Sequence, residues 1–186
     1  MSERGPRRAL VAALLGVAAC HEAGPPGSQG GLAEEYAPEP GATFEYVPEG
    51  AMEALYASNP DGVGAAEGLA TLRVQATETT WELVEGEGRT ASLPWEVTDE
   101  GLFVGGSHLL PPRTGEGEES AGVVVEAAGE YATWYGTFSE ASTARVADGE
   151  LSGEATLARF LGPVQVSFAG KVWELVYYER PTADGA

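Results

Sequence analysis

Two stretches of sequence decide the fold: LATLRVQATETTWELVEGE (residues 69–87) and LGPVQVSFAGKVWELVYYE (residues 161–179). Each reads as a strand, a short turn and a second strand that begins near Trp-Glu-Leu-Val. Alternation with a period of two places apolar side chains on one face of a β-strand. The stretches share seven of nineteen residues at a constant offset of 92. Two interpretations stay open: duplication of one hairpin, or two amphipathic hairpins built from the same few residue types.

The chain around these stretches has the same character. Short β-branched and aromatic runs are separated by glycine-containing turns, which is typical of an all-β protein. We predict an antiparallel barrel, half-barrel or sandwich of about nine to eleven strands, with at most one short helix at 51–57 and a long loop at 105–120. The expected strands are 43–47, 69–76, 80–84, 90–97, 102–104, 123–125, 131–138, 142–146, 151–160, 164–168 and 172–178.

Residues 42–180 are expected to form a single β-rich domain. A domain near 150 residues buries about 68–70% of the surface that its unfolded chain exposes, so a core without disulfides is feasible. Residues 20–41 are rich in glycine and proline and are predicted to be a flexible tether. Residues 181–186 are predicted to be a disordered tail.

The first twenty residues have the pattern of an export signal. Arg4, Arg7 and Arg8 make a basic start, and an apolar run of eleven residues, 9–19, ends at Cys20, the only cysteine of the chain. A basic segment, a short apolar segment and small residues before a cleavage point define a secretory signal. As a helix, the apolar run would extend only about 16 Å, roughly half of a hydrocarbon core. We therefore expect residues 1–19 to be removed.

The ending Val17-Ala18-Ala19-Cys20 resembles the lipobox of bacterial lipoproteins, with valine where that family favours leucine. The resemblance implies that Cys20 becomes the mature N-terminus, acylated on sulfur and usually also on the amine. Two or three acyl chains anchor a protein stably in a membrane. The implied location is the cell envelope, with the anchor in the outer membrane or on the outer face of the cell membrane. The domain would then be periplasmic or surface-exposed. The alternative is an ordinary signal peptide that ends at a cysteine.

The charge of the chain is strongly negative, with 10 basic and 29 acidic residues. Removal of residues 1–19 deletes three arginines and one glutamate, which leaves 7 basic and 28 acidic residues and a net charge of about −21. Nucleic acid is excluded as a partner class, because binding to phosphates needs a basic face. Such a charge favours solubility and attracts cations.

The sequence predicts no catalytic residue, no metal site and no cofactor. His108 is expected in an exposed loop, and the acidic turns at 59–62 and 116–119 are expected to be solvated rather than calcium-bound. Glu82 and Glu174 each follow a tryptophan and are expected on the solvated face of their strands. Adjacent strand residues point to opposite faces, so one aromatic of Trp134-Tyr135 and one of Tyr177-Tyr178 is expected to be the more exposed.

Three functions are weighed. The first is a non-enzymatic envelope lipoprotein, attached to the membrane through Cys20, that binds an envelope protein or has a structural role. The second is a carrier of an apolar ligand. The third is an envelope hydrolase, which would need a cleft with two carboxyl groups of raised pKa. The apolar lining of the carrier would be Leu72, Val74, Trp81, Val166, Phe168 and Trp173.

Overall fold

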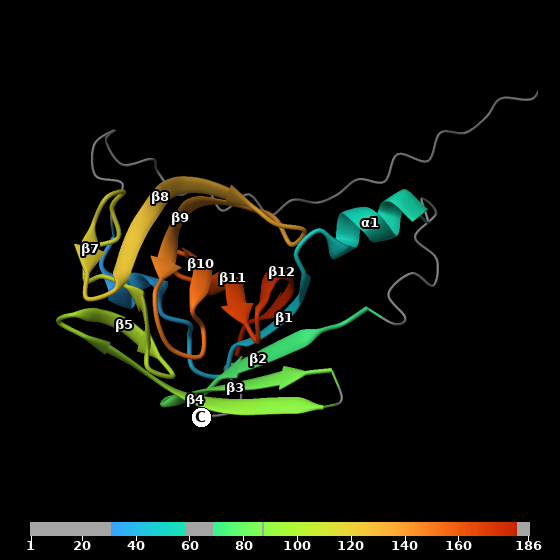
Figure 1. Ribbon diagram of the computed structural model, residues 1–186, viewed down its shortest axis with the longest axis horizontal. Coiled ribbons are helices and arrows are strands. Elements are labelled where there is room, and N and C mark those ends of the chain that lie inside the picture. Colours follow the sequence, from blue (N-terminus) through green and yellow to red (C-terminus); the bar gives the residue numbers. More distant parts are fainter. Residues whose placement is uncertain (1–30, 59–68, 87, 182–186) are drawn as a thin grey trace, which may run out of the picture.

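The computed structural model describes residues 31–58, 69–86 and 88–181. These residues form twelve strands in one antiparallel sheet that curls into a nearly closed barrel (Figure 1). The predicted all-β class is confirmed, with a strand count close to the predicted nine to eleven. The predicted signal peptide at 1–19, Cys20, the turn at 59–62 and the tail from residue 182 lie outside the described residues.

The predicted helix is α1 (Ala51–Ser58), and a 3₁₀ helix, η1 (Ala33–Tyr36), precedes the first strand. In the described part of the chain, no helix is both long enough and apolar enough to cross a membrane. The strands are β1 (Thr43–Pro48), β2 (Leu72–Ala76), β3 (Thr80–Glu85), β4 (Arg89–Thr98), β5 (Gly101–Val104), β6 (Ser107–Leu110), β7 (Glu119–Ser120), β8 (Val123–Ala132), β9 (Thr137–Val146), β10 (Gly153–Ala158), β11 (Gly162–Phe168) and β12 (Lys171–Glu179).

Strand β1 joins the two halves of the sheet. The strand order is β6-β5-β4-β3-β2-β1-β12-β11-β10-β9-β8-β7, so β1 to β6 follow one another and β7 to β12 follow one another. Phe44 of β1 lies opposite Val74 on one side and Tyr178 on the other. The hydroxyl of buried Tyr46 donates to the carbonyl oxygen of Pro163 on β11 at 2.8 Å, and burial raises the pKa of this phenol. The two halves therefore meet at a strand that is tied to both.

The two echoed tryptophans both point into the core, as expected. Trp81 and Trp173 are each at most 1% exposed. Their indole nitrogens differ: Nε1 of Trp173 donates to the carbonyl oxygen of Phe168 at 3.1 Å, whereas Nε1 of Trp81 is buried without a hydrogen-bond partner. The hairpin that leads to Trp173 closes through Ala169 and Gly170, which have φ values of 54° and 75°. Positive φ at both central residues is what a type I′ turn requires.

The expected loop at 105–120 contains two strands, β6 and β7. His108 lies on β6, where it is 6% exposed and stacks on Phe103 of β5 with 4.1 Å between ring centroids. The expectation of an exposed loop histidine is therefore wrong. The strand is only four residues long and is bounded by two glycines and two prolines, so its alternation is too short to be recognised in the sequence.

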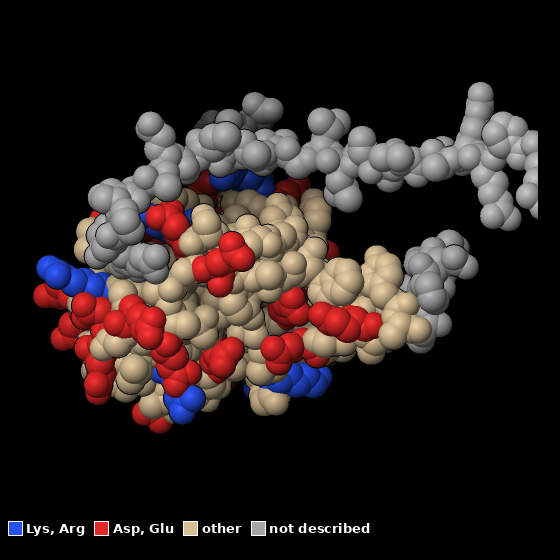
Figure 2. All heavy atoms as spheres, turned by 90° about the horizontal axis from the view of Figure 1, so that it is seen from above, with Lys and Arg blue, Asp and Glu red and all other residues tan. Residues whose placement is uncertain are grey.

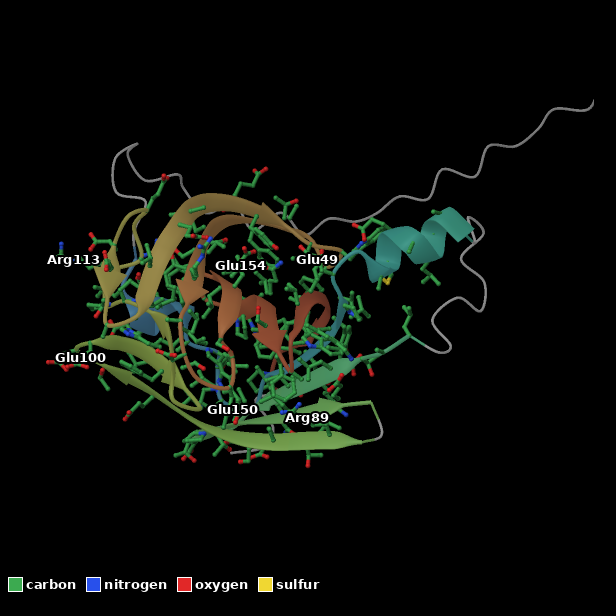
Figure 3. The ribbon with its side chains drawn as sticks, in the orientation of Figure 1. Glu49, Arg89, Glu100, Arg113, Glu150 and Glu154 are labelled. Atoms are coloured by element: carbon green, nitrogen blue, oxygen red, sulfur yellow. The ribbon has the colours of Figure 1, made fainter. Side chains whose placement is uncertain are left out.

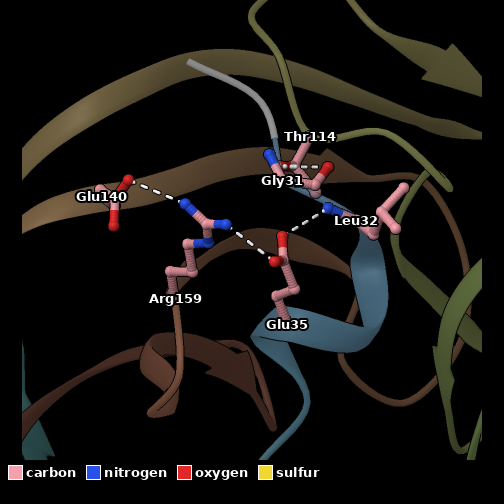
Figure 4. Close-up of polar contacts among 6 residues, drawn as sticks. All are labelled: Gly31, Leu32, Glu35, Thr114, Glu140 and Arg159. Carbon is pink, nitrogen blue, oxygen red and sulfur yellow. Dashed lines mark hydrogen bonds and ion pairs between the residues drawn. The ribbon is translucent and has the colours of Figure 1, made fainter. Parts of the chain in front are cut away.

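The described part of the expected tether packs against the sheet. Tyr36 of η1 is 2% exposed and belongs to the hydrophobic core. The amide N–H of Gly31 donates to Oγ1 of Thr114 at 2.9 Å, and Arg159 forms ion pairs with Glu35 at 2.7 Å and with Glu140 at 2.9 Å (Figure 4). We call this set of contacts the N-terminal clasp. The folded unit therefore extends on the N-terminal side at least to Gly31.

The tryptophan pair generates a prediction on stability. Trp173→Phe should destabilise the protein more than Trp81→Phe by about 1 kcal/mol, because it removes a buried hydrogen bond to the Phe168 carbonyl. Trp81→Phe removes an N–H that has no partner, which offsets part of the lost packing. Urea unfolding of both variants measures the difference. An equal or larger loss in Trp81→Phe would show that this N–H is bonded in solution.

Candidate functional site

The six residues predicted to line a carrier cavity come together inside the barrel. Each is at most 1% exposed, and all belong to one cluster of contacting apolar side chains. They come from the two hairpins that contain the Trp-Glu-Leu-Val echo. Leu72 and Val74 are on β2, Trp81 is on β3, Val166 and Phe168 are on β11, and Trp173 is on β12.

A tight turn at the end of the β8–β9 hairpin exposes two aromatic side chains. The N–H of Thr133 donates to the carbonyl oxygen of Gly136 at 2.8 Å, and the hydroxyl oxygen of Thr133 accepts from the N–H of Tyr135 at 3.1 Å. Trp134 and Tyr135 are 42% and 44% exposed. The prediction of a strand through 131–138, with these two residues on opposite faces, is wrong because the chain reverses there.

These aromatics contact others from distant parts of the sequence. Trp134 stacks on Tyr56 of α1, with ring centroids 5.1 Å apart and planes within 13°. Tyr135 meets Tyr178 of β12 edge to face at 6.4 Å. Tyr177 is exposed and Tyr178 partly buried, as alternation along β12 predicts. We call Tyr56, Trp134, Tyr135 and Tyr178 the aromatic tip. Figure 1 shows the end of the β8–β9 hairpin beside α1.

Glu174 of β12 holds the aromatic tip to the sheet. Its carboxylate accepts the backbone N–H of Trp134 at 3.1 Å. Burial raises the pKa of Glu174 above its ordinary value, and the negative charges of Glu53 and Glu49 add to this rise, while the N–H of Trp134 opposes it. The ionised form of Glu174 is therefore less favourable in the folded protein than in water.

A polar network lies next to Glu174 on the same face of the sheet. Thr156 is fully buried, its Oγ1 lies 2.9 Å from that of Thr143, and it donates to Oε1 of Gln165 at 3.2 Å. Nε2 of Gln165, itself 1% exposed, donates to Oε1 of Glu49 at 3.3 Å. This chain of hydrogen bonds carries polar contacts from β9 across β10 and β11 to Glu49.

Tyr131 of β8 borders this network. Burial raises the pKa of its phenol to about 12, with further contributions from the charges of Glu174, Glu154 and Glu49, against a hydrogen bond with Thr156. Figure 3 shows Glu49 and Glu154 below the arch of β8 and β9. Glu49 and Glu53 therefore act on Glu174, while Glu174, Glu154 and Glu49 act on Tyr131, so four carboxylates lie near this part of the sheet.

Positive side chains do not neutralise these carboxylates within residues 31–58, 69–86 and 88–181. The ion pairs found there join Arg145, Arg159, Lys171 and Arg180 to other glutamates. Seen from above, acidic side chains spread over the face of the molecule while lysine and arginine stay near its edges (Figure 2). The same described ranges hold no group of three or more His, Cys, Asp or Glu side chains placed to bind a metal ion.

Glu82, the counterpart of Glu174 in the echo, has the opposite environment. Its carboxylate accepts the hydroxyls of Ser92 at 2.6 Å and Thr80 at 2.8 Å, and these bonds lower its pKa. Both glutamates lie on the strand face opposite their tryptophan, as expected, but both are partly buried. A hydrolase that uses a pair of carboxyl groups would need a raised pKa at both. Of Glu82 and Glu174, Glu174 alone has a raised pKa.

Comparisons with protein-family models, with curated proteins and with solved structures give no match for this chain. The assignment of its function therefore depends on the residues themselves. The sequence did contain a signal for the aromatic tip, because Thr-Trp-Tyr-Gly has a turn-forming threonine and glycine around its aromatics. The sequence contained no signal for the contact between Glu174 and Trp134, which are forty residues apart.

The two echoed glutamates generate opposite predictions. Glu174→Gln should raise the melting temperature at pH 7, because the folded state no longer holds a desolvated charge. The gain should fade as the pH falls towards 4.5, where the wild-type carboxyl group becomes protonated in the folded state.

Glu82→Gln is the matched control. A lowered pKa means that the folded state favours the carboxylate, so this variant should melt below wild type at pH 7. Its deficit should shrink as the pH falls through the lowered pKa of Glu82. Thermal unfolding followed by circular dichroism from pH 7 to below 4.5 tests both, because the lowered pKa of Glu82 lies below 4.5. Equal shifts of the same sign would contradict the assigned environments.

Proposed function

We propose that this chain is a lipid-anchored protein of the bacterial cell envelope with a non-enzymatic binding role. The support for the anchor is the basic start, the apolar run of eleven residues and the single cysteine directly after Val17-Ala18-Ala19. The support for binding is the aromatic tip, because exposed aromatic side chains grouped beside polar residues are common in recognition surfaces.

The chemistry of the aromatic tip favours a basic segment of another envelope protein as the partner. The carrying observation is the exposed Tyr56–Trp134 stack directly beside Glu174, a partly buried carboxylate without a cationic partner in the described residues. A lysine or arginine over an aromatic face contributes about 0.5–2 kcal/mol. The same cation would offset the cost of the Glu174 charge and lower its pKa.

A carrier function is the second candidate, on one specific observation. Nε1 of Trp81 is buried inside the barrel without a hydrogen-bond partner. An apolar ligand with an oxygen acceptor would satisfy that donor. Native mass spectrometry of the mature protein purified from its own host separates the two candidates. A co-purified lipid-sized mass supports the carrier, and the mass of the acylated chain alone supports the binding protein.

The anchor makes the first prediction of this proposal. Cys20→Ser should abolish incorporation of labelled palmitate and move the protein from the membrane fraction to the soluble exported fraction. The reason is that acyl chains supply the membrane affinity, at about 0.8 kcal/mol per buried methylene. Unchanged membrane association of Cys20→Ser would contradict the lipoprotein assignment.

The proposed class of partner gives the second prediction. A fluorescent hexalysine peptide should bind the wild-type protein, and Trp134→Ala and Glu174→Gln should each weaken that binding about five-fold, the equivalent of about 1 kcal/mol. Fluorescence anisotropy at fixed salt measures this. Glu100→Gln is the charge control, since Glu100 lies at the other end of the molecule from Glu49 (Figure 3). Equal weakening by Glu100→Gln would reduce the effect to general attraction by an acidic surface.

A further inference from the structure

Two large apolar side chains are exposed on either side of the N-terminal clasp. Leu32, just before η1, is 51% exposed, and Phe160, just after β10, is 57% exposed. Phe160 has the largest exposed fraction among the exposed large hydrophobic residues of the described chain. Both side chains therefore present apolar surface where the chain enters the folded unit.

Glu35 fixes the positions of both residues. Its side chain accepts the backbone N–H of Leu32 at 2.9 Å, and its carbonyl oxygen accepts the backbone N–H of Phe160 at 2.6 Å. Arg159 pairs with Glu35 and lies over the ring of Phe160, 4.8 Å from its centroid (Figure 4 shows the pairing). The ion pair lowers the pKa of Glu35, so the clasp stays charged at neutral pH. Leu32 and Phe160 are thus both bonded to Glu35 through their backbones.

The backbone at Phe160 is strained. Its φ of 61° lies in the left-handed region, which bulky side chains rarely occupy. Glycine would adopt this conformation without strain, and a polar side chain would be better solvated there. The chain instead places an exposed phenylalanine at this position, and the bond to Glu35 holds it in place.

The length of chain before the clasp limits how far this face can be from the anchor. Gly31, where the described structure begins, is eleven residues after Cys20. Whatever its conformation, a segment of this length spans at most about 36–40 Å. If Cys20 is acylated, Leu32 is among the described residues that follow the anchor most closely along the chain, and the bond from Phe160 to Glu35 brings Phe160 to the same part of the domain.

We propose that Leu32 and Phe160 contact the lipid bilayer and set the orientation of the domain on the membrane. This inference rests on the proposed lipid anchor. The contact is apolar, and Arg159 is already neutralised by Glu35 and Glu140. It should therefore form on zwitterionic lipid and need no anionic headgroup. The negative charge of the chain disfavours an anionic membrane surface.

The test uses the acylated protein reconstituted in phosphatidylcholine vesicles whose acyl chains carry bromine, a short-range quencher of tryptophan. Phe160→Trp places a reporter in the proposed contact, and Leu32→Trp repeats the test from the other side of the clasp. Val84→Trp is the matched control, because Val84 on β3 is also an exposed large hydrophobic residue, with 39% of its surface accessible. Quenching is calculated after subtraction of the wild-type signal.

We expect the reporters at positions 160 and 32 to lose at least twice the fraction of their emission that the reporter at 84 loses. Quenching at 160 and 32 no greater than at 84 would overturn the inference. Mass spectrometry and vesicle flotation of the same samples report acylation and anchoring separately. Loss of both signals defeats the proposed anchor, whereas an anchored protein with unquenched reporters defeats only the bilayer contact.

Discussion

The pairing of β1 with β12 is the constraint on which the rest of the structure depends. All other neighbours in the sheet are also neighbours in sequence, so each half of the sheet can grow by local hairpins. β1 must instead find a partner more than 120 residues away, and it brings Phe44 and Tyr46 with it into the core. The hydroxyl of Tyr46 reaches past β12 to β11. This long-range closure creates one interior in place of two half-covered sheets, at a high cost in loop entropy.

Strands with clear alternation were predictable, and strands whose limits depend on distant contacts were not. β2, β3, β11 and β12 follow from the spacing of their apolar residues. The errors occur where local pattern competes with turn chemistry. Tyr131–Phe138 has the composition of a strand, yet Thr133 and Gly136 close a turn in its middle. η1 was missed because its burial depends on Tyr36 fitting a core that is built by later residues.

The candidate site shows the same limit more sharply. Trp81-Glu82-Leu83-Val84 and Trp173-Glu174-Leu175-Val176 are identical, and alternation correctly places both tryptophans in the core and both glutamates on the opposite face of their strands, although both glutamates are partly buried rather than solvated. What distinguishes the glutamates is their neighbours across the sheet. Glu82 meets two hydroxyl donors, whereas Glu174 meets the turn of another hairpin and other carboxylates. Local sequence determines the face of a side chain, and tertiary structure determines its chemistry.

The strands at the two ends of the sheet affect how molecules of this protein associate at high local concentration. Strand β6 ends one side of the sheet and lies against β8 and β9, while β7, at the other side, has only two residues and carries Glu119. Long unpaired edges act as templates for neighbouring chains, whereas short or charged edges do not. Because β7 covers only Val123 and Val124 of the ten-residue β8, residues 126–132 of that strand pair with β9 alone in the described part of the chain, and joining of crowded molecules is expected there rather than at β6 or β7.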